Sequence, residues 1–182
     1  PESYQRLQDG DDLLINNRKW QVVIGSGHSP EHVCLYCPEL KVFISGDQVI
    51  PRITSNVSIF PLLPDANPLE NWLNSCARLK QLLPDDILIL PSHQEPFYGL
   101  HHRLEELIQS HQEALERLLA YLQQPRIAID CIQTMFGREI SISEMQFAIG
   151  ETLAHLKYLE QLGQIEHQTA DDGFDYYVKL DK

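Results

Sequence analysis

Residues 27–32, Gly-His-Ser-Pro-Glu-His, connect two apolar runs of the sequence, and His32 is the first residue of the second run. Residues 19–24, Lys-Trp-Gln-Val-Val-Ile, precede this stretch and run into Gly25. Residues 32–37, His-Val-Cys-Leu-Tyr-Cys, follow it and stop at Pro38. Short apolar runs bounded by turn residues are typical of buried strands. The sequence therefore predicts two neighbouring strands with His28 in the loop between them.

Further strands are predicted on either side of this pair. Residues 13–15 lead through an Asn-Asn turn into the run at 19–24. Residues 41–45 form a strand that stops at Gly46 and Asp47, and residues 86–90 form another that stops before His93. Three predicted strands are therefore each followed by a loop that carries a histidine or an aspartate.

Histidine nitrogen and carboxylate oxygen are the usual ligands of catalytic zinc, manganese or iron. Adjacent strand ends bring residues that are distant in sequence together, so His28, Asp47 and His93 are candidate metal ligands. Gly27 and Gly46 permit close approach of the backbone. Histidines and aspartates in loops are also common as solvated residues, and the spacing alone leaves both interpretations open.

Size and charge limit the classes of function. The chain has 182 residues and a net charge of −12, which opposes nonspecific binding to nucleic acid or to an anionic membrane. No apolar run approaches the ~18 residues that span a membrane. Four cysteines in a chain of this length do not suggest a disulfide framework, so a reducing cytoplasm is expected. The isolated C-x-x-C of residues 34–37 is interpreted as ordinary thiols in a strand.

Helices are predicted after residue 66. Asn67 can cap a helix that has Pro68 in its first position, and apolar residues follow at helical spacing: Trp72, Cys76, Leu79 and Leu83. From Leu100 the character changes to a long amphipathic helix at 101–123, a short helix at 127–136 and a third from 143 to Gly163. A hairpin about residues 171–173 follows. This order is typical of a winged-helix module, so we expect a domain boundary near residue 100.

Three segments together resemble the third, fourth and fifth metal motifs of the metallo-β-lactamase superfamily: residues 27–32, 43–47 and 90–93. The likeness continues through residues 47–53 and into the C-terminal helices. With these segments included, the sequence resembles a bacterial branch of metallo-hydrolases with an appended winged-helix domain. The resemblance implies an α+β fold. Residues 1–100 would form the C-terminal half of an αββα sandwich, and residues 101–182 a helical, winged-helix-like domain.

By this resemblance His28 binds one metal ion, Asp47 bridges two, and His93 binds the second. Asp47 is thereby the candidate catalytic residue, and two zinc ions are the expected cofactor, with manganese or iron able to use the same ligands. His32 matches a recurring family position and is interpreted as structural. The implied reaction is hydrolysis of a small ester, thioester or phosphoester, for which the metals lower the pKa of a water toward ~7.

The sequence departs from the family in one large respect. The H-x-H-x-D-H motif, which supplies four further ligands, is not present. We therefore expect the chain to be a fragment of a longer protein that binds metal weakly and shows no useful turnover alone. Apolar sheet surface left uncovered would also favour a homo-oligomer.

The alternative hypothesis is a non-catalytic interaction module in which the winged-helix domain binds protein or nucleic acid. Residues 101–182 hold 7 Lys and Arg against 14 Asp and Glu. Because phosphate contacts need basic side chains, this charge favours protein contacts over nucleic acid. The expected partner is a small-molecule substrate, with no nucleic acid and no membrane.

Overall fold

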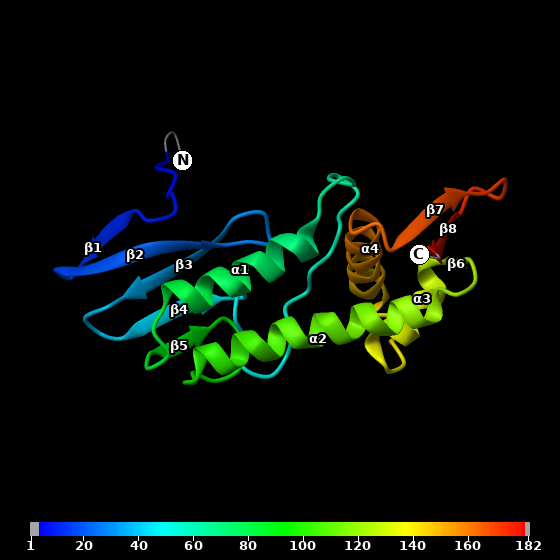
Figure 1. The fold of residues 1–182 in the computed structure, drawn as a ribbon. Coiled ribbons are helices and arrows are strands. Elements are labelled where there is room, and N and C mark those ends of the chain that lie inside the picture. The colour runs from blue at the N-terminus through cyan, green and yellow to red at the C-terminus, as the bar shows by residue number, and fades with distance from the viewer. Residues whose placement is uncertain (1–3, 181–182) are drawn as a thin grey trace. The chain divides into compact units, whose positions relative to one another are not determined.

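A computed structural model describes residues 4–180 (Figure 1). The chain forms two compact units that interleave in sequence. The first unit comprises Pro1–Ser55 and Trp72–Leu107, and the second comprises Asn56–Asn71 and Ile108–Lys182. Within the described residues, no helix is both long enough and apolar enough to cross a membrane.

The first unit is built on a five-stranded sheet in the order β1-β2-β3-β4-β5. Its strands are β1 (Asp12–Ile15), β2 (Arg18–Gly25), β3 (His32–Cys37), β4 (Val42–Gly46) and β5 (Leu88–Pro91). The first four are antiparallel, whereas β5 is parallel to β4. Each predicted strand is thus confirmed to within about two residues at its ends. Asn16 and Asn17 both have positive φ, 49° and 60°, as a tight hairpin turn requires.

One face of this sheet packs against helix α1 (Pro68–Leu82), which lies in front of β2–β4 in Figure 1. The inward side chains of the sheet are Val23, Cys34, Phe43 and Ile89, all with no exposed surface. Trp72, Cys76 and Leu79 of α1 are equally buried. The predicted helical stripe is therefore the contact with the sheet. The predicted cap is also present, since Asn67 Oδ1 accepts the N–H of Glu70 at 3.2 Å.

The opposite face of the sheet remains partly open. Ile24 pairs with Val33, and Leu35, Ile44 and Leu90 form a row across three strands. Val33 and Ile44 are exposed, at 43% and 37%, and the other three are half-buried. Strands with one buried and one polar face normally alternate between apolar and polar residues. These strands are apolar on both faces, the pattern of a sheet that is covered on both sides.

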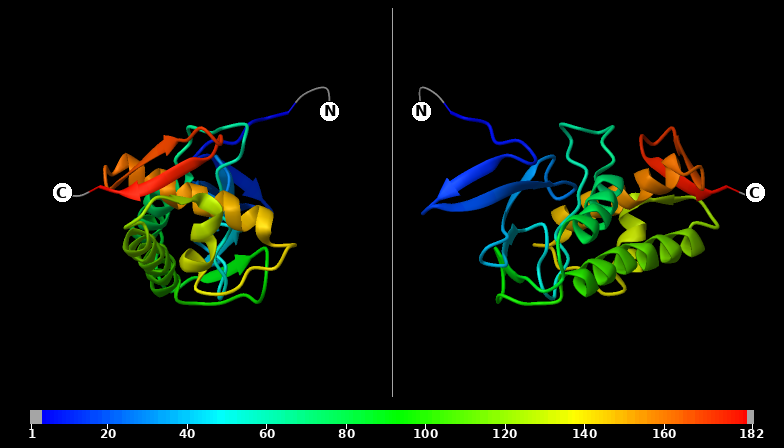
Figure 2. Two further views of the ribbon diagram at one scale, coloured as in Figure 1. Left: turned by 90° about the vertical axis from the view of Figure 1, so that its right-hand side faces the viewer. Right: turned by 60° about the vertical axis from the view of Figure 1, so that its left-hand side comes forward.

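The second unit is mainly helical. It contains the later part of α2 (Leu100–Tyr121), then α3 (Ala128–Phe136) and α4 (Met145–Gln161), with the hairpin β7 (Ile165–Thr169) and β8 (Asp175–Lys179). Figure 2 shows this hairpin following α4. A two-residue strand, β6 (Arg126–Ile127), adds to β8, so the small sheet has the order β6-β8-β7. Strand β6 was not predicted, because two residues carry no periodicity.

Helix α4 is buried along much of its length, and residues 56–59 lie against it. The N–H of Ile59 donates to the carbonyl of Gly150 at 3.1 Å. A Cβ atom at Gly150 would come within 2.8 Å of Ser58 Oγ, so only glycine allows this close approach. The middle of α4 is therefore covered by residues 56–59.

A group of buried polar side chains accompanies this contact. Asn56 Nδ2 donates to Glu151 Oε2 at 3.0 Å. His155 Nδ1 donates to the Glu151 carbonyl at 2.8 Å, which leaves its Nε2 to accept from His111 Nδ1 at 3.0 Å. Burial lowers the pKa of His111 to about 3 and that of His155 to about 4. Both rings are therefore neutral at pH 7.

A first prediction concerns Gly27, which has φ +108° and lies against the backbone of α1. A Cβ atom there would come within 2.7 Å of Trp72 Cα. Gly27→Ala should therefore destabilise the first unit by about 2–5 kcal/mol, from backbone strain and from displacement of the helix. Urea unfolding followed by the fluorescence of Trp20 and Trp72, both in this unit, measures the loss.

Gly10→Ala is the matched control. Gly10 has φ +84°, but a Cβ atom at this position would meet only open space. The substitution should cost only the strain, about 1–2 kcal/mol. Equal losses in the two variants would contradict the packing of Gly27 against α1.

A second prediction concerns Glu151. Burial raises the pKa of its carboxyl to about 7, partly opposed by the hydrogen bond from Asn56. The folded protein therefore holds a proton that the unfolded chain releases near pH 4.5, and stability is lost as the pH rises from about 4.5 to 7. Glu151→Gln should remove this loss, so that its stability relative to wild type grows by a few kcal/mol, on the order of 1.4 per pH unit.

Thermal and urea unfolding at pH 5 and pH 8 measure this difference. Glu166→Gln, on the exposed part of β7, serves as the control and should follow the wild type at both pH values. The two histidines act in the opposite sense, because their lowered pKa values make stability rise with pH below about 6.5. Comparing variant with wild type cancels their contribution. A difference between variant and wild type that does not change with pH would rule out titration of Glu151.

Candidate metal centre

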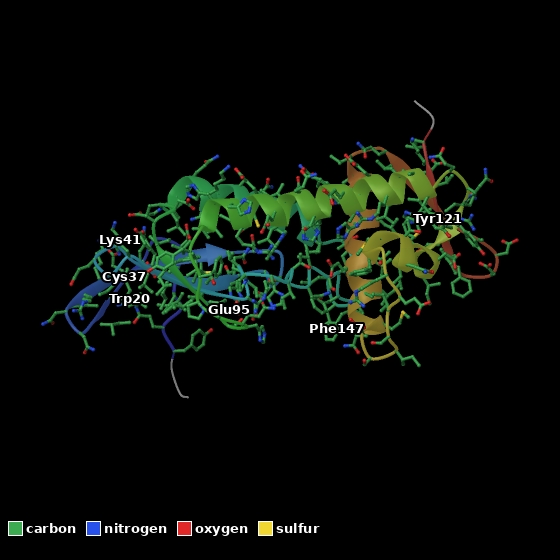
Figure 3. All side chains as sticks on the ribbon, turned by 90° about the horizontal axis from the view of Figure 1, so that it is seen from below. Trp20, Cys37, Lys41, Glu95, Tyr121 and Phe147 are labelled. Atoms are coloured by element: carbon green, nitrogen blue, oxygen red, sulfur yellow. The ribbon has the colours of Figure 1, made fainter. Side chains whose placement is uncertain are left out.

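The sheet topology brings the three predicted ligand segments to one end of the sheet. The loop at residues 26–31 joins the end of β2 to the start of β3, and the antiparallel β4 ends beside it. Because β5 is parallel to β4, it ends there too. Figure 3 shows Glu95, just beyond this end, well away from Trp20, Cys37 and Lys41 at the other.

Asp47 lies between the two candidate histidines. Its Oδ1 atom is 3.3 Å from His93 Nε2, and its Oδ2 atom is 3.9 Å from His28 Nε2. Each carboxylate oxygen therefore faces a different imidazole. The side chains of Asp47 and His28 are about 30% exposed, whereas His93 is 65% exposed. The structure thus brings all three predicted residues together, at a place that solvent reaches.

Three other side chains fix Asp47 itself. The N–H of Asp47 donates to His32 Nε2 at 3.1 Å. The Ser92 hydroxyl donates to Asp47 Oδ1, and the Ser55 hydroxyl donates to its carbonyl oxygen. Sequence reasoning placed His32 near the site as a structural residue, but it missed both serines. Only the position of Ser92 next to His93 at a strand end could have pointed to it.

His32 is held in the form that accepts this hydrogen bond. Burial, and then the nearby His28, lower the pKa of its ring, partly opposed by Asp47. A neutral ring has one nitrogen without a proton, and the hydrogen bond from the Asp47 N–H requires that nitrogen to be Nε2. Gly46 has φ +55°, and a Cβ atom there would collide with His32 Nε2. Glycine at position 46 is therefore what lets His32 reach the backbone of Asp47.

The segment after Asp47 is also well anchored. Arg103 Nε donates to the Ile50 carbonyl at 2.7 Å, and its Nη2 donates to the Ile53 carbonyl at 2.9 Å. Gln94 Oε1 accepts the N–H of Arg52 at 3.1 Å. Residues 48–55, for which the sequence predicts neither strand nor helix, thus form an ordered edge beside the candidate site.

The donor set fits part of a metal centre. Two imidazoles and a carboxylate match zinc chemistry. Among residues 4–180, however, no group of three or more histidine, cysteine, aspartate or glutamate side chains is arranged to hold a metal ion. The three residues therefore supply suitable ligand chemistry, but as they are arranged they do not themselves form a group that holds an ion.

The cysteines do not offer another site. All four are buried free thiols. Burial raises the pKa of Cys34 to about 12. The register places Cys34 opposite Val23 and Cys37 opposite Val42, so they lie on opposite faces of β3. The interpretation of this C-x-x-C as ordinary thiols agrees with this geometry.

Comparison with known proteins gives two family matches. Residues 1–93 match the model of the metallo-beta-lactamase superfamily, and residues 115–180 match that of the metallo-beta-lactamase-like C-terminal domain. Over 93 residues the chain is 32% identical to acyl-coenzyme A thioesterase MBLAC2 of Gallus gallus, covering 50% of this chain and 31% of that protein. Over 134 residues it is 25% identical to hydroxyacylglutathione hydrolase of Hydrogenovibrio crunogenus, covering 73% of this chain and 46% of that protein.

Solved structures resemble the chain over almost its whole length. A beta-lactamase domain protein from Burkholderia ambifaria matches with a TM-score of 0.93 and 42% identity, covering 99% of this chain and 53% of that one. A metallo-beta-lactamase family protein from Thermus thermophilus matches with a TM-score of 0.84 and 30% identity, covering 99% and 56%. The chain thus spans about half the length of these two proteins and less of the curated relatives. With half of its residues matched by the family model, this chain belongs to the metallo-beta-lactamase superfamily.

Proposed function

We propose that this chain is the C-terminal part of a metal-dependent hydrolase with a binuclear zinc centre. One observation carries the proposal: Asp47 presents one oxygen to His93 and the other to His28. A carboxylate with two differently directed oxygens is suited to bridging two ions. Relatives named as hydrolases support the reaction class.

The roles of the residues follow from their positions. His28 and His93 would each hold one ion, and Asp47 would bridge both. Bound zinc supplies a Lewis acid and lowers the pKa of water to about 7. The chain's own contribution is to fix these ligands on strand ends and to keep Asp47 oriented through its hydrogen bonds. Manganese or iron would use the same donors.

A thioester is the first substrate class to test. The thioesterase of Gallus gallus acts, by its name, on acyl-coenzyme A, in which sulfur carries the acyl group. The name hydroxyacylglutathione hydrolase also describes an acyl group carried by a thiol compound. Esters and phosphoesters remain within the proposal, because the ligand set does not discriminate among them.

The remaining ligands would lie on a segment outside these 182 residues. The open apolar face of the first unit, at Ile24, Val33 and Ile44, supports this proposal, since a second sheet packed there would complete an αββα sandwich. By itself the chain would bind metal weakly and show no useful turnover. Residues 1–100 would form the half-sandwich and residues 101–182 a winged-helix-like domain, with residues 56–71 belonging to the compact unit of the second.

Helix α4 would be the recognition helix if that domain bound DNA. Its middle is covered by residues 56–59, and residues 101–182 are acidic overall. These observations favour a role in packing or in shaping the substrate site over nucleic-acid binding. A cytoplasmic location is also part of the proposal, supported by four free cysteines.

A third prediction tests the centre directly. Zinc content and thioesterase activity should be measured for this chain and for a version extended upstream by some 150 residues. We expect at most weak zinc binding by the chain, and about two zinc ions with activity in the extended protein. Asp47→Ala in the extended protein should lower zinc content and abolish turnover, because it removes a ligand from both ions.

Asp65→Ala is a suitable control, since Asp65 is an exposed acid in the second unit. It should leave zinc content and turnover unchanged. An extended protein that takes up no metal, or an Asp47→Ala variant that retains both ions, would refute the proposed function.

A fourth prediction concerns self-association through the open sheet face. An apolar surface of this kind should pair with a second copy when nothing else covers it. Ile44→Lys should shift the chain toward the monomer in sedimentation velocity, because a charge in the middle of the row opposes burial. Ile142→Lys, at a 95% exposed apolar residue of the second unit, should not. A monomeric wild type at high concentration, or equal effects of both changes, would contradict this expectation.

A further inference from the structure

We infer that Ser92 and His32 are positioning residues for Asp47: Ser92 sets the rotation of its carboxylate, and His32 sets the backbone from which that carboxylate projects. The inference deepens the proposed metal centre and rests on it. Neither residue is among the candidate ligands. Each forms a hydrogen bond with a different atom of Asp47.

A backbone hydrogen bond positions Ser92. Its N–H donates to the Gly46 carbonyl at 3.1 Å, where the pairing of β4 with β5 shifts register. This contact sets Ser92 beside Asp47 although 45 residues separate them. The Ser92 hydroxyl is the donor, and the Asp47 carboxylate oxygen accepts.

The effect of this hydrogen bond depends on which carboxylate oxygen of Asp47 accepts it. Ser92 binds Oδ1, the oxygen that also faces His93. With Oδ1 fixed, Oδ2 is directed toward His28. Without the hydroxyl, the carboxylate could rotate about its terminal torsion, which is soft for aspartate. Ser92 thereby keeps the two oxygens assigned to two different histidines.

His32 acts on the backbone. Its Nε2 accepts the Asp47 N–H, and its ring lies edge-on to His28 with 5.8 Å between the centroids. A nitrogen that accepts this N–H has no lone pair left for a metal ion, so His32 is assigned a supporting role. The collision of any Cβ at Gly46 with this ring shows how closely the loop is fitted around the hydrogen bond.

Residues behind metal ligands commonly change metal affinity by 10–100-fold when they are replaced. We therefore expect Ser92→Ala to weaken zinc binding by about 10-fold or more, and Ser92→Thr to restore most of it because the hydroxyl is kept. Ser92 is exposed, so the added methyl group has room. His32→Ala should weaken binding similarly, and His32→Gln, which keeps an acceptor, should weaken it less.

The experiment measures zinc affinity by competition with a chromogenic chelator, using this chain and the upstream-extended protein. The visible spectrum of the cobalt-substituted protein is a second readout, since altered ligand geometry changes it independently of turnover. Ser143→Ala, an exposed serine of the second unit, is the matched control. Trp fluorescence confirms that each variant is folded.

The outcomes separate the two proposals. Weaker zinc binding in Ser92→Ala and His32→Ala, with recovery in Ser92→Thr, supports positioning. Wild-type affinity and an unchanged cobalt spectrum in both alanine variants would overturn it and leave the proposed centre intact. Recovery in neither conservative variant would assign the loss to packing and would also overturn it. A wild type that binds no metal in either form would overturn the proposed function and this inference with it.

Discussion

The parallel pairing of β4 with β5 is the constraint on which the first unit depends. A parallel pair cannot be joined by a tight turn, so the chain must cross over, and α1 lies within that crossover. The crossover buries one face of the sheet under Trp72 and its neighbours. It also returns the chain so that Ser92 and His93 emerge beside Asp47. The same connection thus builds the core and assembles the candidate site.

Much of this arrangement could be predicted because its signals are local. The strands, the cap at Asn67 and the buried stripe of α1 are each encoded within a few residues. His28, Asp47 and His93 stood out because each lies at a strand end, where topology alone brings residues together. The hydrogen bonds of Asp47 could not be predicted, since they depend on side-chain positions from three separate segments.

The second unit shows the same limit. Asn56 and Glu151 are 95 residues apart, and no pattern connects them. Glu151 is a charged residue on a predicted helix, yet it is 7% exposed, and its carbonyl accepts a hydrogen bond from His155, which in turn accepts one from His111. The burial of a charge depends on which segments pack over the helix. Here residues 56–59 pack over the helix. The glycine at position 150 permits this close contact, but the sequence does not show which segment makes it.

The hydrogen bonds around Asp47 also explain how the three candidate ligands keep a defined geometry. Its amide, its carbonyl and one carboxylate oxygen are each bound by a different side chain: His32, Ser55 and Ser92. Ordering these groups costs conformational entropy, and in the folded sheet they are already ordered. Further ligands would then need only to approach a carboxylate that already faces both histidines. A centre assembled from two parts of a chain benefits from such order, because a preformed half loses less entropy when the other half binds.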